Sequence, residues 1–169
     1  PEKFLLLGRK GTGKTLLTRY IKKMSLDNPS QLVEIRSLSD FRFSDIQPFR
    51  IDNNTYSEYL PIMEWIILIH LSELIVRDRS IQNTALQETL REFLETNFKL
   101  KISDERVIEQ TRRQEIKGTV KISSSQTESD VIKNHGNYLD YLNDLRDTVL
   151  ALLANSQCHY SVYYDDLDD

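Results

Sequence analysis

The chain has 169 residues, with 22 lysines and arginines against 26 aspartates and glutamates, which gives a formal net charge of -4. This length suits one domain with a real core, and 39% hydrophobic with 28% charged residues excludes a membrane protein and a disordered tail. The acidic balance makes the segment as a whole a poor binder of nucleic acid. The single cysteine, Cys158, excludes an internal disulfide framework and favours a reducing compartment, so we expect a cytoplasmic protein.

The first predicted elements are a strand and a helix joined by a glycine-rich turn. Phe4–Leu7 is an apolar run of strand length, and three of the five glycines follow within residues 8–13. Glycines gathered in this way indicate a tight backbone turn. From Lys14 the apolar spacing becomes helical, and the helix is expected to stop near Asn28. Its apolar residues are Leu16, Leu17, Tyr20, Ile21 and Met24.

The next elements are a strand at Leu32–Arg36, a loop at 41–54 and a helix at 61–78. A membrane span is the alternative for the helix. A span needs about 20 predominantly apolar residues, and Glu64, His70 and Glu73 interrupt this one. We therefore predict a core helix in which His70 is a packed or hydrogen-bonded residue.

A further helix is predicted from Thr84, as the N-cap, to about Asn97, with Gln87 placed for a capping box. Its apolar face consists of Leu86, Leu90, Phe93 and Leu94. Alternating apolar residues predict two short strands on either side of a charged helix, at 98–102, 104–114 and 116–122.

Residues 123–130 are polar and predict a loop. Asn137 is the predicted cap of a helix that reaches about Asn155. Its stripe of Tyr138, Leu142, Leu145, Val149 and Leu152 favours core packing, with a partner helix as the alternative. The final strand is predicted at His159–Tyr164 and is followed directly by Asp165-Asp166.

Residues 8–15, Gly-Arg-Lys-Gly-Thr-Gly-Lys-Thr, match the phosphate-loop motif G-x-x-x-x-G-K-[ST] in full, between a predicted strand and a predicted helix. Glycines let successive backbone N–H groups turn inward, and the positive end of the following helix completes an anion cradle. Lys14 can reach the β- and γ-phosphates, and the Thr15 hydroxyl can bind Mg²⁺. For Arg9 and Lys10, phosphate contact and solvated surface charge both stay open. The predicted nucleotide-binding residues are Gly8, Arg9, Lys10, Gly11, Thr12, Gly13, Lys14, Thr15 and Leu16.

The two aspartates after the last strand supply the acid that such a site needs. A carboxylate at the tip of a buried strand is held rigidly and faces the crevice where open α/β sheets bind ligands. We assign Asp165 to the metal and Asp166 to the attacking water, with an acidic, solvated chain end as the alternative. The predicted catalytic residues are Lys14, Asp165 and Asp166, and the predicted metal ligands are Thr15 and Asp165.

Gly8–Thr15 together with Val162-Tyr163-Tyr164-Asp165-Asp166-Leu167-Asp168 resembles the additional-strand P-loop ATPases. Among them the chain is most similar to KAP-type and STAND-like ATPases, and it also resembles a related bacterial group found in stress and antiviral defence genes. The resemblance covers two short motifs at the two ends of the chain. It implies ATP and Mg²⁺ as ligands, phosphate contacts from Gly8 to Thr15, magnesium coordination by Thr15 and Asp165, and an acidic catalytic role at Asp166.

The sequence departs from that family in ways that bear on activity. Many relatives have Glu at the position of Asp166, and the shorter Asp predicts slower hydrolysis. Arg often stands where this chain has Asp169. A sensor residue and an arginine finger would lie beyond residue 169.

The expected fold is an α/β three-layer P-loop NTPase with a parallel sheet core, truncated at its C-terminus. Thr15 and Asp165 are 150 positions apart, whereas a crossover unit takes about 30 residues. We therefore predict a core at 1–40 and 131–169 and a largely helical insertion at about 50–130. Interleaved charges between Glu105 and Lys121 favour a solvated face over a nucleic-acid groove.

The leading functional hypothesis is an ATPase that drives switching or assembly in a larger protein, as a homo-oligomer or with an effector domain. A nucleotide-gated scaffold with little hydrolysis is the alternative, because of Asp166. The paired acid after a long helical stretch disfavours a phosphotransferase, and the lack of an Asn-Lys-x-Asp motif in the sequence disfavours a GTPase. Adenine preference comes from the resemblance alone. Glu34 is a fallback water activator, although a surface role is favoured.

Overall fold

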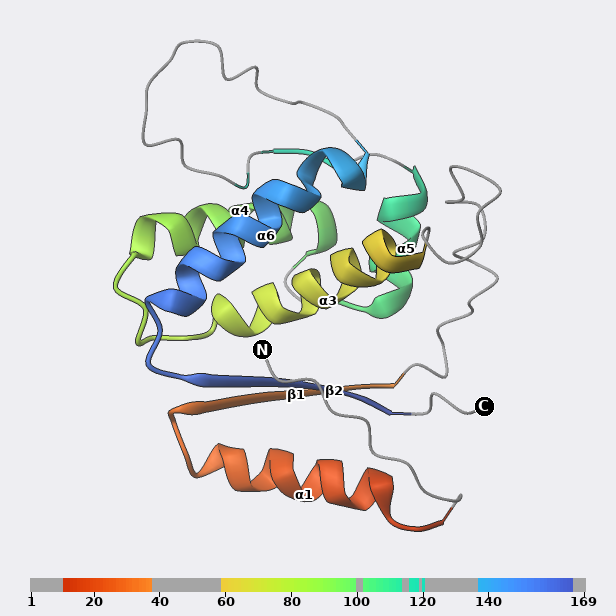
Figure 1. Ribbon diagram of the computed structural model, residues 1–169, viewed down its shortest axis with the longest axis vertical. Helices are drawn as coiled ribbons and strands as arrows, with labels where there is room; N and C mark the ends of the chain where they lie inside the picture. The colour runs from red at the N-terminus through yellow and green to blue at the C-terminus, as the bar shows by residue number, and fades with distance from the viewer. Residues whose placement is uncertain are drawn as a thin grey trace.

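The computed structural model describes residues 11–37, 59–99, 102–113, 116–118, 120 and 137–165. In chain order they form α1 (Lys14–Leu26), β1 (Gln31–Ser37), α3 (Tyr59–Ile75), α4 (Thr84–Phe98), α5 (Asp104–Arg113), α6 (Tyr138–Ala154) and β2 (His159–Asp165). The strands lie between α1 on one face and the remaining described helices on the other (Figure 1). The predicted strand Phe4–Leu7 and the predicted loops 41–54 and 123–130 lie outside the described residues.

The two strands pair in parallel, from Gln31 beside His159 to Ser37 beside Asp165. Parallel strands need a crossover that carries the chain back to the starting end of the sheet, and the helices from α3 to α6 make this connection. Both strands therefore end on the same side, which we call the carboxyl end of the sheet; it lies on the right in Figure 1. The predictions of both strands are confirmed.

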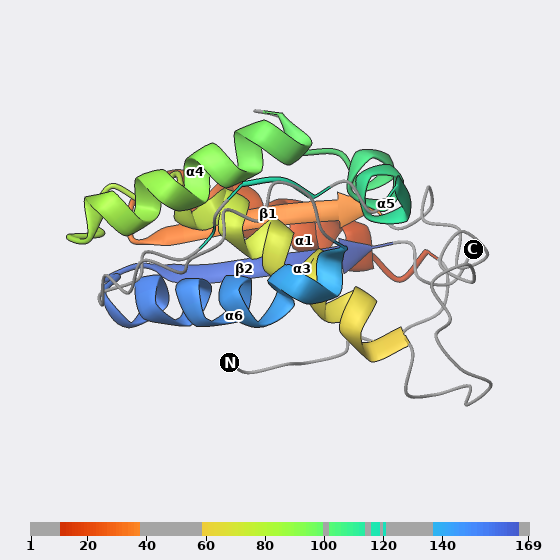
Figure 2. The same ribbon diagram turned by 90° about the horizontal axis from the view of Figure 1, so that it is seen from above.

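The hydrophobic core lies on the face of the sheet opposite α1, where α3 runs between α4 and α6 (Figure 2). Trp65 of α3 is fully buried and meets Phe93 and Phe98 of α4 edge-on, with ring centroids 6.4 Å apart in both pairs. Its indole N–H donates to the Thr111 hydroxyl of α5 at 3.1 Å. The prediction of a buried core helix is therefore confirmed, although α3 ends at Ile75 rather than at residue 78. None of the helices in the described part of the chain has the length and apolarity needed to cross a membrane.

Helix α6 is capped as predicted by Asn137. The Asn137 side chain accepts hydrogen bonds from the N–H groups of Leu139 and Asp140, and the Asp140 carboxylate accepts one from the Asn137 N–H in return, which makes a capping box. The apolar stripe is buried throughout: Tyr138, Leu142, Leu145, Val149 and Leu152. The prediction that this stripe packs in the core, rather than binding a partner helix, is confirmed.

The predicted cap of α4 is wrong by one residue. Asn83 is the N-cap, and its side chain accepts from the Leu86 N–H at 3.2 Å, while Thr84 is the first helical residue. Asn and Thr are both good caps, so the local sequence alone does not separate them. Gln87 forms no capping box with Thr84: it is buried, and its amide donates to the carbonyls of Ile75 and Asp78, both at 2.7 Å.

The predicted strand at 98–102 is also wrong where the structure describes it. Phe98 is the last residue of α4 and is fully buried, four residues after buried Leu94, so its spacing continues the helix. Lys99, with φ of 63°, ends that helix. Ile116 and Val120 are buried, but the described residues at 116–118 and 120 include no strand. The charged helix between these segments is confirmed as α5.

Helix α1 is confirmed, but most of its apolar residues are exposed, and among the predicted ones only Ile21 is partly buried. Leu16 is 72% exposed and Tyr20 is 58% exposed, and Leu17 and Met24 are exposed as well. The buried residues of this helix are Thr18 and Ser25. Their hydroxyls donate to the carbonyls of Thr15 and Lys22, at 3.0 and 2.7 Å, which satisfies them within the helix.

Candidate phosphate and magnesium site

The chain enters α1 through two glycines in the left-handed region. Gly11 has φ of 87° and Gly13 has φ of 89°. Gly13 is the N-cap, and its carbonyl accepts the first helical hydrogen bond, from the Leu17 N–H at 2.9 Å. A Cβ added to either glycine would meet no atom within 4 Å. The backbone conformation, rather than lack of space in this structure, therefore requires glycine.

The first turn of α1 carries the described part of the motif to the carboxyl end of the sheet. Helix α1 ends at Leu26 and the chain turns back into β1 at Gln31, so α1 and β1 run in opposite directions. With a rise of 1.5 Å per residue the 13-residue helix is about 20 Å long, close to the roughly 23 Å of the seven-residue strand. The start of α1, which carries Lys14 and Thr15, consequently lies at the end of the sheet where β1 and β2 stop (Figures 1 and 2).

The pleat of β2 separates its side chains between the two faces of the sheet. Tyr160 and Tyr164 pack against the hydrophobic core, on the face covered by α3. Successive side chains along a strand point to opposite faces. Asp165, the last residue of β2, therefore faces the α1 side, the same side as Lys14 and Thr15.

The structure thus brings to one end of the sheet all of the predicted site residues that it describes. Gly11–Leu16 and Asp165 lie at one end of the sheet, from segments far apart in sequence. Lys14 is half-buried, and Thr15 and Leu16 are exposed. Gly8, Arg9, Lys10 and Asp166 lie outside the described residues.

These groups fit a magnesium–phosphate ligand by their chemistry. The helix N-terminus starts without a side-chain cap, at a glycine, and such an end favours an anion. A hydroxyl and a carboxylate are oxygen ligands, and Mg²⁺ on a nucleotide needs only one or two carboxylates beside phosphate and water. No cluster of three or more His, Cys, Asp or Glu side chains suited to a metal occurs within the described ranges.

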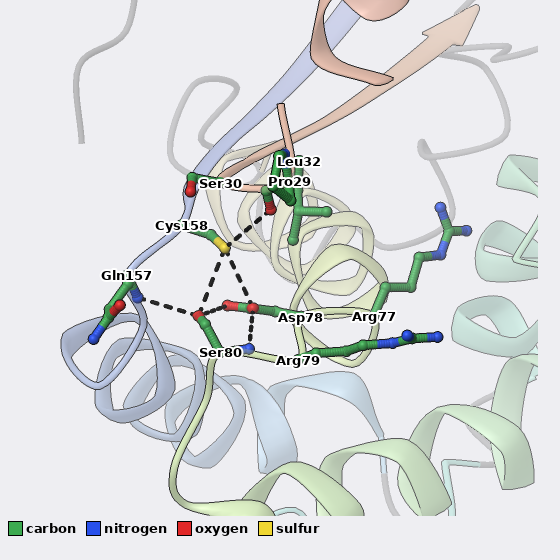
Figure 3. Close-up of a pocket in the computed structure, with 9 residues that line it drawn as sticks. All are labelled: Pro29, Ser30, Leu32, Arg77, Asp78, Arg79, Ser80, Gln157 and Cys158. Atoms are coloured by element: carbon green, nitrogen blue, oxygen red, sulfur yellow. Dashed lines mark hydrogen bonds between the residues drawn. The ribbon is translucent and has the colours of Figure 1, made fainter. Parts of the chain in front are cut away.

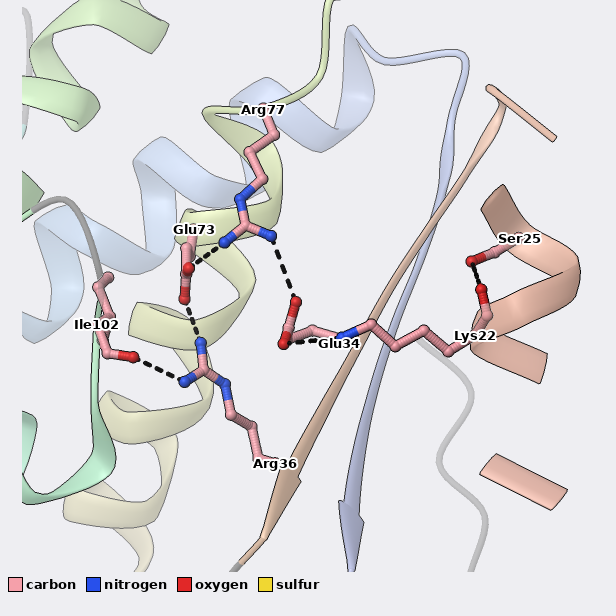
Figure 4. Close-up of polar contacts among 7 residues, drawn as sticks. All are labelled: Lys22, Ser25, Glu34, Arg36, Glu73, Arg77 and Ile102. Atoms are coloured by element: carbon pink, nitrogen blue, oxygen red, sulfur yellow. Dashed lines mark hydrogen bonds and ion pairs between the residues drawn. The ribbon is translucent and has the colours of Figure 1, made fainter. Parts of the chain in front are cut away.

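Sequence reasoning missed an ion-pair network on β1. Glu34 lies in the middle of the strand and is paired with Lys22 of α1 and with Arg77, which follows α3, each at 3.3 Å (Figure 4). Both carboxylate oxygens are engaged, so Glu34 ties together the helices on the two faces of the sheet. Glu34 therefore lies away from the carboxyl end of β1, and its ion pairs connect elements of the fold.

The same network continues toward the carboxyl end of β1. Glu73 of α3 is paired with both Arg77 and Arg36. The Arg36 guanidinium also donates to the Ile102 carbonyl at 2.8 Å. The side chains of Arg36 and Glu73 are largely shielded from water, so this part of the network is largely buried.

A second polar cluster lies at the opposite end of the sheet, beside a cavity of about 390 Å³ (Figure 3). At its centre Asp78, 4% exposed, accepts hydrogen bonds from the Ser156 hydroxyl at 2.5 Å, the Ser80 N–H at 2.7 Å and the Tyr160 hydroxyl. Burial raises the pKa of Asp78, but the hydrogen bonds outweigh it and hold the pKa well below its usual range. Burial and the contact with Asp78 raise the pKa of Tyr160. Cys158 also belongs here, with its sulfur 3.3 Å from an Asp78 oxygen.

Neither polar cluster had a local signal in the sequence that marks it as a whole, because contacts that join its elements link distant residues: Arg36 and Glu73 are 37 positions apart, and Asp78 and Tyr160 are 82 apart. Comparison with protein-family models, curated proteins and solved structures gives no match.

Proposed function

We propose that the chain is an ATP-binding and ATP-hydrolysing P-loop domain that acts as a nucleotide-driven switch or assembly motor. The observation that carries the proposal is the meeting of two segments. The start of α1, which the chain enters through two glycines with positive φ, lies at the carboxyl end of the parallel sheet. Asp165, the last residue of β2, lies at the same end and faces the same side of the sheet as α1. Open parallel sheets bind ligands at this end.

In this proposal each group of the chain has a task in phosphoryl transfer to water. The backbone N–H groups at the start of α1 bind the phosphates, and the Lys14 ammonium stabilises the charge that develops on them. Thr15 and Asp165 hold the magnesium ion, which when bound neutralises phosphate charge. Asp166 is the predicted residue that orients the attacking water.

The proposed domain has a sheet with more strands than the two described ones. The segment Phe4–Leu7 is predicted to form one of these additional strands. The exposed apolar stripe of α1 supports this idea. Lys22 reaches Glu34 from one side of the helix, and at 100° per residue Leu16, Tyr20 and Met24 lie on the other side. Additional strands beside β2 would cover these side chains.

The experiment that tests the proposal compares Lys14→Ala with Lys23→Ala in an ATP hydrolysis assay. Lys23 is a matched control because it is an exposed lysine in the last turn of the same helix. We expect Lys14→Ala to abolish turnover, because it removes the charge that stabilises the transition state, while Lys23→Ala hydrolyses ATP like the parent protein. Normal turnover in Lys14→Ala would refute the proposal.

A nucleotide-gated scaffold is the second candidate, favoured by Asp rather than the longer Glu at position 166. Single-turnover hydrolysis measured beside ATP affinity separates the two candidates. Tight binding with hydrolysis far below typical enzymatic rates, roughly 1 to 1000 per second, would support the scaffold. A burst at an ordinary enzymatic rate would exclude it.

A further inference from the structure

A buried histidine contacts the strand that leads into the candidate site. His70 of α3 is fully buried, and its Nδ1 shares a hydrogen bond of 2.9 Å with the Tyr164 hydroxyl. The two rings also pack together, with centroids 5.8 Å apart. Tyr164 is the penultimate residue of β2 and directly precedes Asp165.

The neighbouring strand is anchored to the same turn of α3. Arg36 lies beside Tyr164 in the sheet register, and it is paired with Glu73, three residues after His70. Residues three apart lie on one side of a helix. One turn of α3 therefore holds the penultimate residues of both strands, Tyr164 through a hydrogen bond and Arg36 through a largely buried ion pair.

Fixing Tyr164 also fixes the point from which Asp165 projects. The two residues share a peptide unit, and their side chains leave the strand on opposite faces. A side chain that binds a metal must be held within about 0.5 Å of its productive position, and the contacts around it provide this precision. Contacts on the α3 face of β2 can thus set the position of a carboxylate on the α1 face.

We propose that His70 and Tyr164 are positioning residues for Asp165 and that their hydrogen bond sets the affinity of the nucleotide site for its divalent cation. This inference rests on the proposed function, because it assigns Asp165 to the metal. In this proposal neither residue contacts the metal or the nucleotide. They act through the end of β2, as the outer partners of metal ligands do elsewhere.

The test is the affinity of the ATP complex for Mn²⁺, measured by electron paramagnetic resonance on the full chain. Tyr164→Phe keeps the ring and removes only the hydroxyl. We expect its Mn²⁺ affinity to fall about tenfold, the lower range for loss of an outer partner. ATP affinity in the presence of a chelator should stay within about twofold, because the phosphate cradle lies on another segment.

Two further changes separate positioning from general destabilisation. Tyr160→Phe removes a hydroxyl from the same face of β2 at its other end, where the partner is Asp78, so it should leave Mn²⁺ affinity within about twofold. His70→Asn keeps a polar atom at the position of Nδ1 and should retain most of the affinity. His70→Leu should reproduce the loss seen with Tyr164→Phe.

Equal Mn²⁺ affinity in Tyr164→Phe and the parent protein would overturn the inference while leaving the proposed function intact. An equal loss in Tyr160→Phe would also overturn it, since the effect would then come from weakening the strand as a whole. Failure of the parent protein to bind ATP would overturn the proposed function itself, and the inference with it.

Discussion

At the scale of single residues, the glycines of the phosphate loop illustrate how backbone conformation selects an amino acid. Gly13 caps α1 with φ of 89°, and Gly118, outside the candidate site, has φ of 90°. In neither case does a neighbouring atom within 4 Å forbid a side chain. The two positions therefore share one constraint, the left-handed backbone, but differ in their proposed task.

This pair allows stability and ligand binding to be separated. We expect Gly13→Ala and Gly118→Ala each to lower the free energy of unfolding by about 1 kcal/mol, the cost of holding a Cβ in the left-handed region. Only Gly13→Ala should weaken ATP binding, because it disturbs the proposed anion cradle. Urea unfolding and ATP titration of both variants check this, and equal ATP affinity in the two would contradict the role of Gly13.

At the scale of elements, Asp78 joins segments that the sequence keeps far apart. It follows α3, and its partners Ser156 and Tyr160 lie before and within β2. The carboxylate is buried and accepts several hydrogen bonds, so its charged form is favoured in the folded state. The amino end of β2 is thereby attached to the end of α3.

The depressed pKa of Asp78 makes a prediction about pH. Because the folded-state pKa lies below the unfolded value of about 3.9, the stabilisation is complete above about pH 5 and is lost as the pH falls through the folded-state pKa. Asp78→Asn should lower the free energy of unfolding by about 2 kcal/mol at pH 7, and the difference from the parent protein should shrink below about pH 4.

Denaturant unfolding at a series of pH values measures this difference. Asp27→Asn is the control, because Asp27 is an exposed residue at the end of α1, and it should change stability by less than about 0.5 kcal/mol. A difference between Asp78→Asn and the parent protein that does not change with pH would exclude the charged carboxylate as its cause.

Local patterns predicted the elements whose spacing is unambiguous. The mostly apolar run of β2 and the stripe and cap of α6 are each encoded within a short stretch of sequence. The structure has them as predicted, with β2 one residue longer, to Asp165. The alternation of Phe98 with the apolar residues after it predicts a strand. Burial four residues after Leu94 makes it helical instead, and the chain turns at Lys99.

At the scale of the whole molecule, the residues of the candidate site were predictable where the motif is contiguous. Gly11–Leu16 and Asp165 follow from local sequence, and the turn between α1 and β1 together with the parallel register places them at one end of the sheet. The supporting contacts were not predictable, because Glu34 and Arg77 are 43 positions apart and His70 and Tyr164 are 94 apart. Such pairs arise only from the packing of the helical layer on the sheet.

The central claim is that the start of α1 and the end of β2 together hold a magnesium–nucleotide complex. The most direct test is equilibrium ATP binding, with and without Mg²⁺, for the parent protein, Lys14→Ala and Asp165→Asn. We expect Mg²⁺ to strengthen binding to the parent protein. Lys14→Ala should bind at least about tenfold more weakly, since it loses a charge-assisted contact. Asp165→Asn should bind ATP alone normally but lose the gain from Mg²⁺. Binding to both variants that equals binding to the parent protein, or no binding to the parent protein, would contradict the claim.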